Sequence, residues 1–262
     1  MQLAHRVALN GVQLDEIDPR IIIKGIEGGA GKDTVNTVSL GGGDGTRITG
    51  KRRDSIEVAV RFSMNIRRDA IAERAAVLEA INAWAVNGGW LTINYKPDRQ
   101  LYVDEIITPG EGDLWKRLTE YTITFRAHAV PYWQQAGAVS ATTGASNTGS
   151  GAIQVAGSAK TVAEAVLRNM SGATINTATI TIGGKSMAFE NLGLGDGQSL
   201  TIDHIITDGI YALRIRIGNA SAMARRTDGS ADDFEISPGA NSFSFSAQRA
   251  CRMTVSCRGR FV

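Results

Sequence analysis

The stretch Ile56-Glu-Val-Ala-Val-Arg-Phe-Ser-Met-Asn-Ile66 decides the fold class, because an apolar side chain stands at every second position. Successive side chains of a strand point to opposite faces, so this pattern predicts a long strand with one buried face. Residues 69–86 then predict an amphipathic helix, which Asp69 can cap and a glycine pair at 88–89 can end. Arg74 lies within the apolar face near the helix start, where its long side chain can reach solvent.

Further strands are predicted on both sides of this strand and helix. Residues 20–26 form a β-branched run, residues 90–107 fit a hairpin, and residues 114–130 fit a long strand that Pro131 ends. Short alternating segments with frequent glycine turns and no helix fill the carboxyl-terminal part of the chain, a pattern typical of a β-sandwich.

These segments predict a mainly β protein in two domains. We expect an amino-terminal β domain with one helix at residues 1–134 and a β-sandwich at residues 152–262. Residues 135–151 are almost entirely Ala, Ser, Thr and Gly, and we interpret them as a spacer that has nothing to bury.

The composition is that of a globular protein with almost balanced charge. The 28 basic and 26 acidic residues leave a formal charge of +2, which does not favour specific nucleic-acid binding. The start of the chain does not have the pattern of a secretory signal, and no apolar run approaches the roughly 20 residues of a membrane helix. We therefore expect no membrane insertion and folding in a cytoplasm. Cys251 and Cys257 are too far apart along one predicted strand for a disulfide.

The sequence contains no complete motif for catalysis or cofactor binding. Residues 27–34 resemble a phosphate-binding loop, but Ile26 and Asp33 stand where that loop needs a glycine and a hydroxyl. The glycines of residues 193–197 lack the spacing and the βαβ context of a dinucleotide site. The three histidines are isolated in the sequence. The sequence therefore predicts no catalytic residue, no cofactor and no metal site.

The helix predicts a surface for contact with another subunit or domain. Its large side chains share one face, and alanine rather than charge occupies the opposite face at Ala72, Ala76, Ala80 and Ala83. A helix exposed on a monomer normally carries lysine and glutamate there. The hypothesis is that the alanines allow close approach of a second surface, and the alternative is that alanine is simply the best helix former.

The glycine-rich residues 28–50 predict an arm or β-hairpin that projects from the first domain. Dense glycine makes ordering costly, so we expect the arm to become ordered on contact with a neighbouring protomer or with another component of an assembly. The candidate contact residues are Gly28, Gly29, Gly31, Gly41, Gly42 and Gly43.

Tyr132 and Trp133 stand where the first domain meets the spacer. Buried aromatic side chains commonly anchor contacts, so we predict that this pair packs between the two domains. A sugar-stacking surface is the alternative.

Three passages carry a resemblance to a known family. They are the strand and helix of residues 55–84, with a tryptophan near the helix end; the strand Thr122-Ile-Thr-Phe-Arg-Ala-His-Ala-Val-Pro-Tyr-Trp133; and the run Phe234-Glu-Ile-Ser-Pro-Gly-Ala-Asn-Ser-Phe243, followed by a strand that ends Cys257-Arg-Gly-Arg-Phe261. In this order the chain resembles the siphophage distal tail protein, the baseplate hub of long non-contractile tails. The resemblance is one of pattern and covers nearly the whole chain.

The resemblance implies both a fold and a role. It implies an amino-terminal β-barrel-like domain with one helix and a carboxyl-terminal galectin-like β-sandwich. It also implies a homo-oligomer, a hexameric ring, that joins the tail tube protein to the tail tip protein and the receptor-binding protein and leaves a channel for DNA. Such a protein belongs to the distal end of the virion tail and is assembled in the cytoplasm of the host bacterium. The family offers no catalytic residues to carry over.

Two other classes of function remain open from the sequence. The carboxyl-terminal sandwich could be an adhesion module that binds glycans of the host surface. A cell-wall hydrolase is a third interpretation, which would need paired carboxylates in a cleft.

Overall fold

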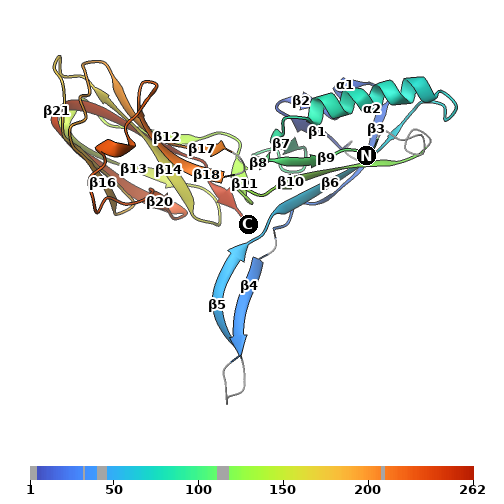
Figure 1. The fold of residues 1–262 in the computed structure, drawn as a ribbon, viewed down its shortest axis with the longest axis horizontal. Helices are drawn as coiled ribbons and strands as arrows, with labels where there is room; N and C mark the ends of the chain where they lie inside the picture. The colour runs from blue at the N-terminus through green and yellow to red at the C-terminus, as the bar shows by residue number, and fades with distance from the viewer. Residues whose placement is uncertain (1–4, 32, 40–45, 111–117, 208–209) are drawn as a thin grey trace. The chain divides into compact units, whose positions relative to one another are not determined.

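The computed structural model describes residues 5–31, 33–39, 46–110, 118–207 and 210–262. The chain divides into two compact units, Met1–Trp133 and Gln134–Val262. Both units are built mainly of strands, and the long helix α2 belongs to the first (Figure 1). The prediction of a mainly β protein with a helix-containing first half is confirmed, and the sheets are curled. A short helix, α1 (Leu14–Ile17), was not predicted.

Two larger sheets belong to the first unit. Within this unit one sheet has the strand order β2-β1-β7-β8, and the other has the order β3-β6-β10-β9. The bounds in the first sheet are β1 (Val7–Leu9), β2 (Val12–Gln13), β7 (Gly89–Ile93) and β8 (Arg99–Val103). In the second sheet they are β3 (Ile21–Gly28), β6 (Ile56–Met64), β9 (Glu105–Ile107) and β10 (Tyr121–Ala127).

Buried side chains of α2 (Ile71–Ala85) and of both sheets form the core of the first unit. Strand β6 buries every second side chain, as its alternating sequence predicts. Its neighbour β10 pairs with it in antiparallel register, Phe125 opposite Val58, and buries the same face. The indole of Trp84 on α2 meets the ring of Phe125 edge to face, with centroids 6.1 Å apart. The helix therefore covers the apolar face of this sheet (Figure 1).

The prediction that Asp69 caps the long helix is wrong. Helix α2 begins at Ile71, its N-cap position is Ala70, and no side chain caps it. The carboxylate of Asp69 instead accepts hydrogen bonds from the guanidinium of Arg67, at 3.1 and 2.6 Å. The predicted end is observed, since Gly88 follows the helix with a φ of 60°.

Strands β4 (Asp33–Ser39) and β5 (Thr46–Arg53) pair only with each other and form a separate two-stranded sheet, here called the hairpin. It corresponds to the predicted arm, and it extends away from the other strands of the first unit (Figure 1). Gly41, Gly42 and Gly43 of the predicted contact set lie outside the described residues.

The second unit is a β-sandwich organised by the 19-residue strand β21 (Gly239–Cys257). The first half of β21 pairs with β13 (Ser146–Val155) and β15 (Ala178–Ile182). The second half pairs with β12 (Val139–Thr142) and β14 (Thr161–Asn169). One strand thus serves both layers, which enclose a single apolar core.

The remaining elements extend these layers. Strand β16 pairs with β15, while β17, β18 and β19 follow β14 in order, and β20 pairs with the start of β14. Their bounds, with those of the 3-10 helix η1 and of the strands at either end of the unit, are β11 (Trp133–Gln135), β16 (Lys185–Phe189), β17 (Ser199–Thr207), β18 (Ile210–Ile217), β19 (Ala220–Ser221), η1 (Met223–Arg225), β20 (Glu235–Ile236) and β22 (Arg260–Phe261).

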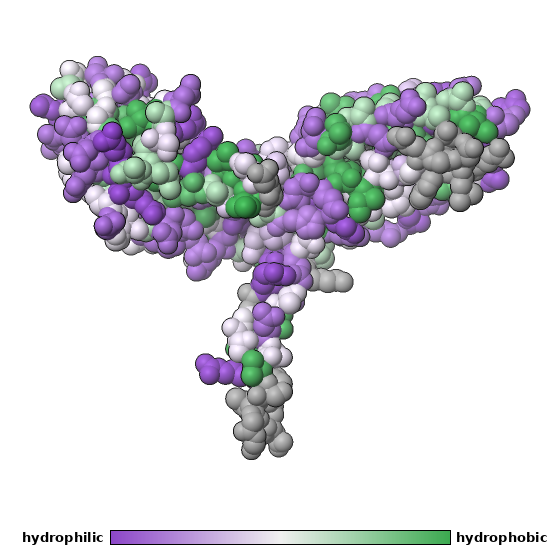
Figure 2. Space-filling view, in the orientation of Figure 1, coloured by the Kyte–Doolittle hydropathy of each residue, from purple (hydrophilic) through white to green (hydrophobic). Residues whose placement is uncertain are grey.

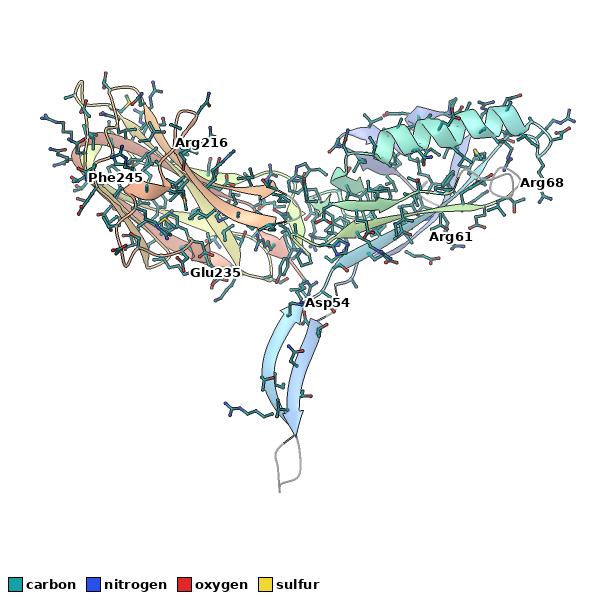
Figure 3. The ribbon with its side chains drawn as sticks, in the orientation of Figure 1. Asp54, Arg61, Arg68, Arg216, Glu235 and Phe245 are labelled. Carbon is teal, nitrogen blue, oxygen red and sulfur yellow. The ribbon has the colours of Figure 1, made fainter. Side chains whose placement is uncertain are left out.

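The stretch predicted as a spacer is ordered. Residues 135–151 include β12 and the first part of β13, and both pair with β21. The glycines have a packing reason: a Cβ on Gly149 would lie 2.5 Å from the ring of Phe245, and one on Gly151 would lie 2.5 Å from the ring of Phe243 (Phe245 is labelled in Figure 3). The small residues that suggested a linker leave room for aromatic rings on the neighbouring strand.

Candidate assembly surfaces

The described residues contain no cluster of three or more His, Cys, Asp or Glu side chains that could hold a metal ion. Among the helices described, none is long and apolar enough to cross a membrane. Cys251 and Cys257 are free and buried, and burial raises the pKa of each thiol to about 11. At neutral pH both are therefore protonated and inert as nucleophiles.

The outward side of α2 is the first candidate surface. Ala72, Ala76, Ala80 and Ala83 are all exposed, and Figure 2 shows hydrophobic residues along this helix. Two glutamates, Glu73 and Glu79, are also exposed on this side of the helix. The carboxylate of Glu73 forms an ion pair with the guanidinium of Arg20, with an N–O distance of 2.7 Å. The side is thus a mixture of alanine and carboxylate. Its role in contact with a second surface stays a prediction.

Arg74 does not reach solvent. Its side chain is 2% exposed, and the guanidinium donates hydrogen bonds to the carbonyl oxygens of Ile66 and Leu118 and to the hydroxyl of Tyr121. It also lies 5.7 Å from the centre of the Tyr121 ring. The prediction that this side chain reaches solvent is wrong. The buried guanidinium is instead stabilised by hydrogen bonds to the backbone carbonyls of Ile66 and Leu118.

The hairpin is the second candidate surface. Val35, Val38 and Ile48 are 44%, 56% and 64% exposed, and Figure 2 shows isolated hydrophobic residues among polar ones along it. Arg47 and Arg52 are also exposed, so the described part of the hairpin presents apolar and basic groups together. Thr37 stands opposite Ile48 and Val38 opposite Arg47, which places apolar side chains on both faces.

The hairpin is attached through a cluster that we call the root cluster: Gly29, Gly31, Arg53, Tyr132 and Trp133. The Nε of Arg53 donates to the carbonyl oxygen of Pro131 at 2.9 Å, and its guanidinium lies 5.1 Å from the centre of the Tyr132 ring. The Nε1 of Trp133 donates to the carbonyl oxygen of Gly29 at 2.7 Å. Asp54, labelled in Figure 3, marks where the hairpin leaves the unit.

The predicted interdomain pair therefore has defined contacts within the first unit. Trp133 is 1% exposed, and the Nζ of Lys96 lies 4.5 Å from the centre of its ring. An additional role for Tyr132 and Trp133 between the units stays a prediction. Of the predicted arm glycines, Gly29 and Gly31 belong to the root cluster. Gly28 precedes it with a φ of 85° and passes so close to Glu57 that a Cβ would lie 2.4 Å from its carbonyl oxygen.

The third candidate surface is the face of the β3-β6-β10-β9 sheet opposite α2, here called the charged face. Side chains of alternate residues form two ion-pair ladders across its strands. In one, Arg61 bridges Glu27 and Glu120; in the other, Arg126 bridges Glu57 and Glu105, and His128 also contacts Glu105. Figure 3 labels Arg61 on this face.

Within the two ladders, four glutamates share two arginines and one histidine. Hydrogen bonds from His128 and Arg126 hold the pKa of Glu105 below its ordinary value, so that carboxylate stays ionised. Exposed ion pairs contribute only about 0–1 kcal/mol each to stability. The ladders therefore determine the charged character of the surface more than the stability of the fold, and exposed Ile22 and Ile107 lie on the same face.

A cavity of about 130 Å³ lies in the second unit and is lined by Thr161, Glu164, Tyr211 and Arg258 among others. Burial and the nearby charge of Asp203 raise the pKa of Glu164. Sites for small-molecule ligands usually measure about 300–1,000 Å³. This cavity is smaller than such sites, but a second one in the same unit, of about 320 Å³ and lined by Thr177, Phe189 and Gln248 among others, lies within their range. The glycan-binding interpretation therefore stays a prediction.

Sequence reasoning missed two of these features. The alternation of Glu57 and Arg61 with apolar residues did signal a polar face, but the ladder needs the register with β10 to bring Arg126 beside Glu57. No local signal identified Arg53 as the residue at the hairpin root. Its partners Pro131 and Tyr132 are far away in the sequence.

No family model and no curated protein matches the chain. The solved structures that share its fold include proteins of phage tail hubs and baseplates. One is SPP1 Dit (gp 19.1), described as a paradigm of the hub adsorption apparatus in phages that infect Gram-positive bacteria. It overlaps with a TM-score of 0.68 and 14% identity over 98% of this chain and 99% of that chain. Structures of the activated phage P2 baseplate with Ca and with Sr each give a TM-score of 0.50 and 7% identity, also over 98% and 99% of the chains. At these identities the comparison establishes the fold, from one end of the chain to the other.

Proposed function

We propose that this chain is a structural subunit of the distal tail hub of a long-tailed phage or of a phage-derived tail particle. The observation that carries the proposal is the match of both units, in one chain and in the same order, to a tail hub protein over 98% of this chain and 99% of that one. A sandwich alone is common to many functions. This pairing of a helix-covered, hairpin-bearing unit with a sandwich is more specific.

In the proposed assembly, six copies form a ring around an opening for DNA. The ring joins the tail tube protein to the tail tip protein and to the receptor-binding protein, and it is assembled in the cytoplasm of the host bacterium before it becomes part of the virion. The hydrated charged face supports exposure to water over burial in an interface, because burying its carboxylates would cost free energy that the ion pairs do not repay. The alanine side of α2 and the hairpin are the surfaces we assign to contacts with neighbouring copies or tail components.

The hairpin supports this assignment by its exposed apolar side chains. Val38 and Ile48 are each more than half exposed on a two-stranded ribbon with no other strand beside it. Isolated two-stranded hairpins are marginally stable in water, so a partner that covers these side chains would stabilise the ribbon. We therefore expect slower amide exchange of the hairpin in assembled tails than in the isolated subunit.

Electron microscopy of the purified full-length chain tests the proposal. We expect sixfold rings with a central opening, and labelled antibody against the chain should mark the distal end of intact tails. A chain that stays monomeric at high concentration and is absent from the tail end would contradict it. A ring of another symmetry located at the tail end would correct the number of copies and leave the role in place.

A further inference from the structure

The root cluster connects two segments that are distant in the sequence. On one side are the two ends of the hairpin, at Gly29–Gly31 and at Arg53. On the other is the segment 131–133, where the chain leaves the first unit before entering the second at Gln134. The two sides are joined by the bond from Trp133 to Gly29, by the bond from Arg53 to Pro131 and by the packing of Arg53 on Tyr132.

These contacts leave the root little freedom. The Trp133 ring is 1% exposed, and the oxygen of Gly29 would lose the hydrogen bond from the indole N–H if the hairpin turned away. Arg53 has a side chain that is 7% exposed, and it also pairs with Asp33 across the first rung of the hairpin, at 3.5 Å. The hairpin therefore cannot pivot at its root without breaking bonds to the segment 131–133, and that segment cannot move without loosening the hairpin.

We propose that the root cluster is a mechanical coupling between the hairpin and the connection to the second unit. A partner that holds the hairpin restrains residues 131–133, and a load applied through the second unit loosens the hairpin. Such coupling is reciprocal, because a change in one equilibrium shifts the other by the same factor. The coupling itself is a property of the folded chain; only the identity of the partner, a neighbouring copy, rests on the proposed function.

Replacing Trp133 by phenylalanine tests one direction. The substitution keeps an aromatic ring and removes the N–H that donates a hydrogen bond to the carbonyl oxygen of Gly29. We expect amide exchange of the strand residues nearest the root, Asp33, Thr34 and Arg52, to become about tenfold faster, the factor that a lost buried hydrogen bond of ordinary strength produces. Trp84→Phe is the matched control, because it removes a bond of the same kind, from Nε1 to the oxygen of Val12 at 3.3 Å, away from the hairpin.

Replacing Gly31 by alanine tests the reverse direction. A Cβ at Gly31 would lie 2.3 Å from an Nη of Arg53, so the guanidinium that contacts Pro131 and Tyr132 must shift. We expect faster exchange of the Tyr132 amide, which is bonded to the oxygen of Val130 at 2.7 Å. Gly50→Ala in the same hairpin is the control, since its Cβ would meet nothing closer than Asn36 at 3.7 Å.

Both measurements are made by hydrogen exchange on the full chain at a concentration where it is monomeric. The proposal is supported if Trp133→Phe and Gly31→Ala each speed exchange across the cluster while their controls do not. It is overturned if either variant changes amide exchange only on the side of the cluster where the substitution lies. It is also overturned if the controls speed exchange equally, which would indicate general destabilisation. Because the chain is monomeric in this assay, failure to form rings in the microscope would contradict the proposed function and leave this result unaffected.

Discussion

Replacing Ala76 and Ala80 together by glutamate tests whether the outward side of α2 is buried between copies. Both alanines are exposed and lie opposite the buried face of Val77, Leu78 and Ile81, so the new side chains displace no atom of their own unit. The variant therefore separates the assembly from the fold of the subunit.

The expected free-energy cost to the helix is smaller than the expected cost to the interface, so the two can be measured separately. Each glutamate costs the helix less than about 0.7 kcal/mol in propensity. Three like-charged pairs, between positions 76 and 80 and from position 76 to Glu73 and Glu79, add about 0.2–0.5 kcal/mol each. In an interface, an uncompensated buried carboxylate costs about 2–5 kcal/mol. Two of them at the low end, about 4 kcal/mol, weaken association about a thousandfold, since 1.4 kcal/mol is tenfold.

Light scattering over a concentration series measures the association, and tryptophan fluorescence during thermal unfolding measures the fold. All four tryptophans lie in the first unit, so the fluorescence reports on that unit alone. We expect monomers that still unfold cooperatively, with a melting temperature lowered only by the cost to the helix. Ala76→Ser with Ala80→Ser is the control, because it keeps the volume small and adds no charge. An unchanged mass for the glutamate variant would refute the assignment of this surface.

Other substitutions test the interiors of the two units. Arg74→Met should destabilise the first unit by about 3 kcal/mol, because it leaves buried acceptors unpaired. Arg67→Met, at a side chain 83% exposed, should change the urea midpoint little. Burial raises the pKa of Glu164 above 4.5, so its contribution to stability is present below pH 4.5 and is lost as the pH rises through the folded value. Glu164→Gln should therefore raise the calorimetric midpoint more at pH 8 than at pH 4, and an equal gain at both would contradict this. With a pKa of about 11, only about one thousandth of Cys251 and Cys257 is ionised at pH 8. A thiol reagent should thus label both only after unfolding, and rapid labelling of the folded chain would be the contrary result.

Local patterns determined the parts of the fold that depend on near neighbours in the sequence. The alternation of residues 56–66 specified a strand with one buried face, and that face is buried in β6. The glycines at 88–89 marked the helix end. Composition misled where a small residue serves a distant partner: the glycines at 149 and 151 suggested a spacer, but they make room for rings on β21.

The candidate surfaces divide in the same way. The exposed alanines of α2 follow from helical periodicity, so the sequence alone placed them on the side away from the core. The root cluster depends on pairs 78 positions apart, for Arg53 and Pro131, and 104 apart, for Trp133 and Gly29. The burial of Arg74 likewise depends on Tyr121, 47 positions away.

The sequence by itself thus determined the strongly periodic strand and helix of the first unit, and which side of each is apolar, because periodicity is a property of neighbouring residues. Only the tertiary structure decided the strand register, the charge ladders, the contacts of the small residues and the attachment of the hairpin. These depend on which distant segments meet, and that choice is made by packing both units as a whole.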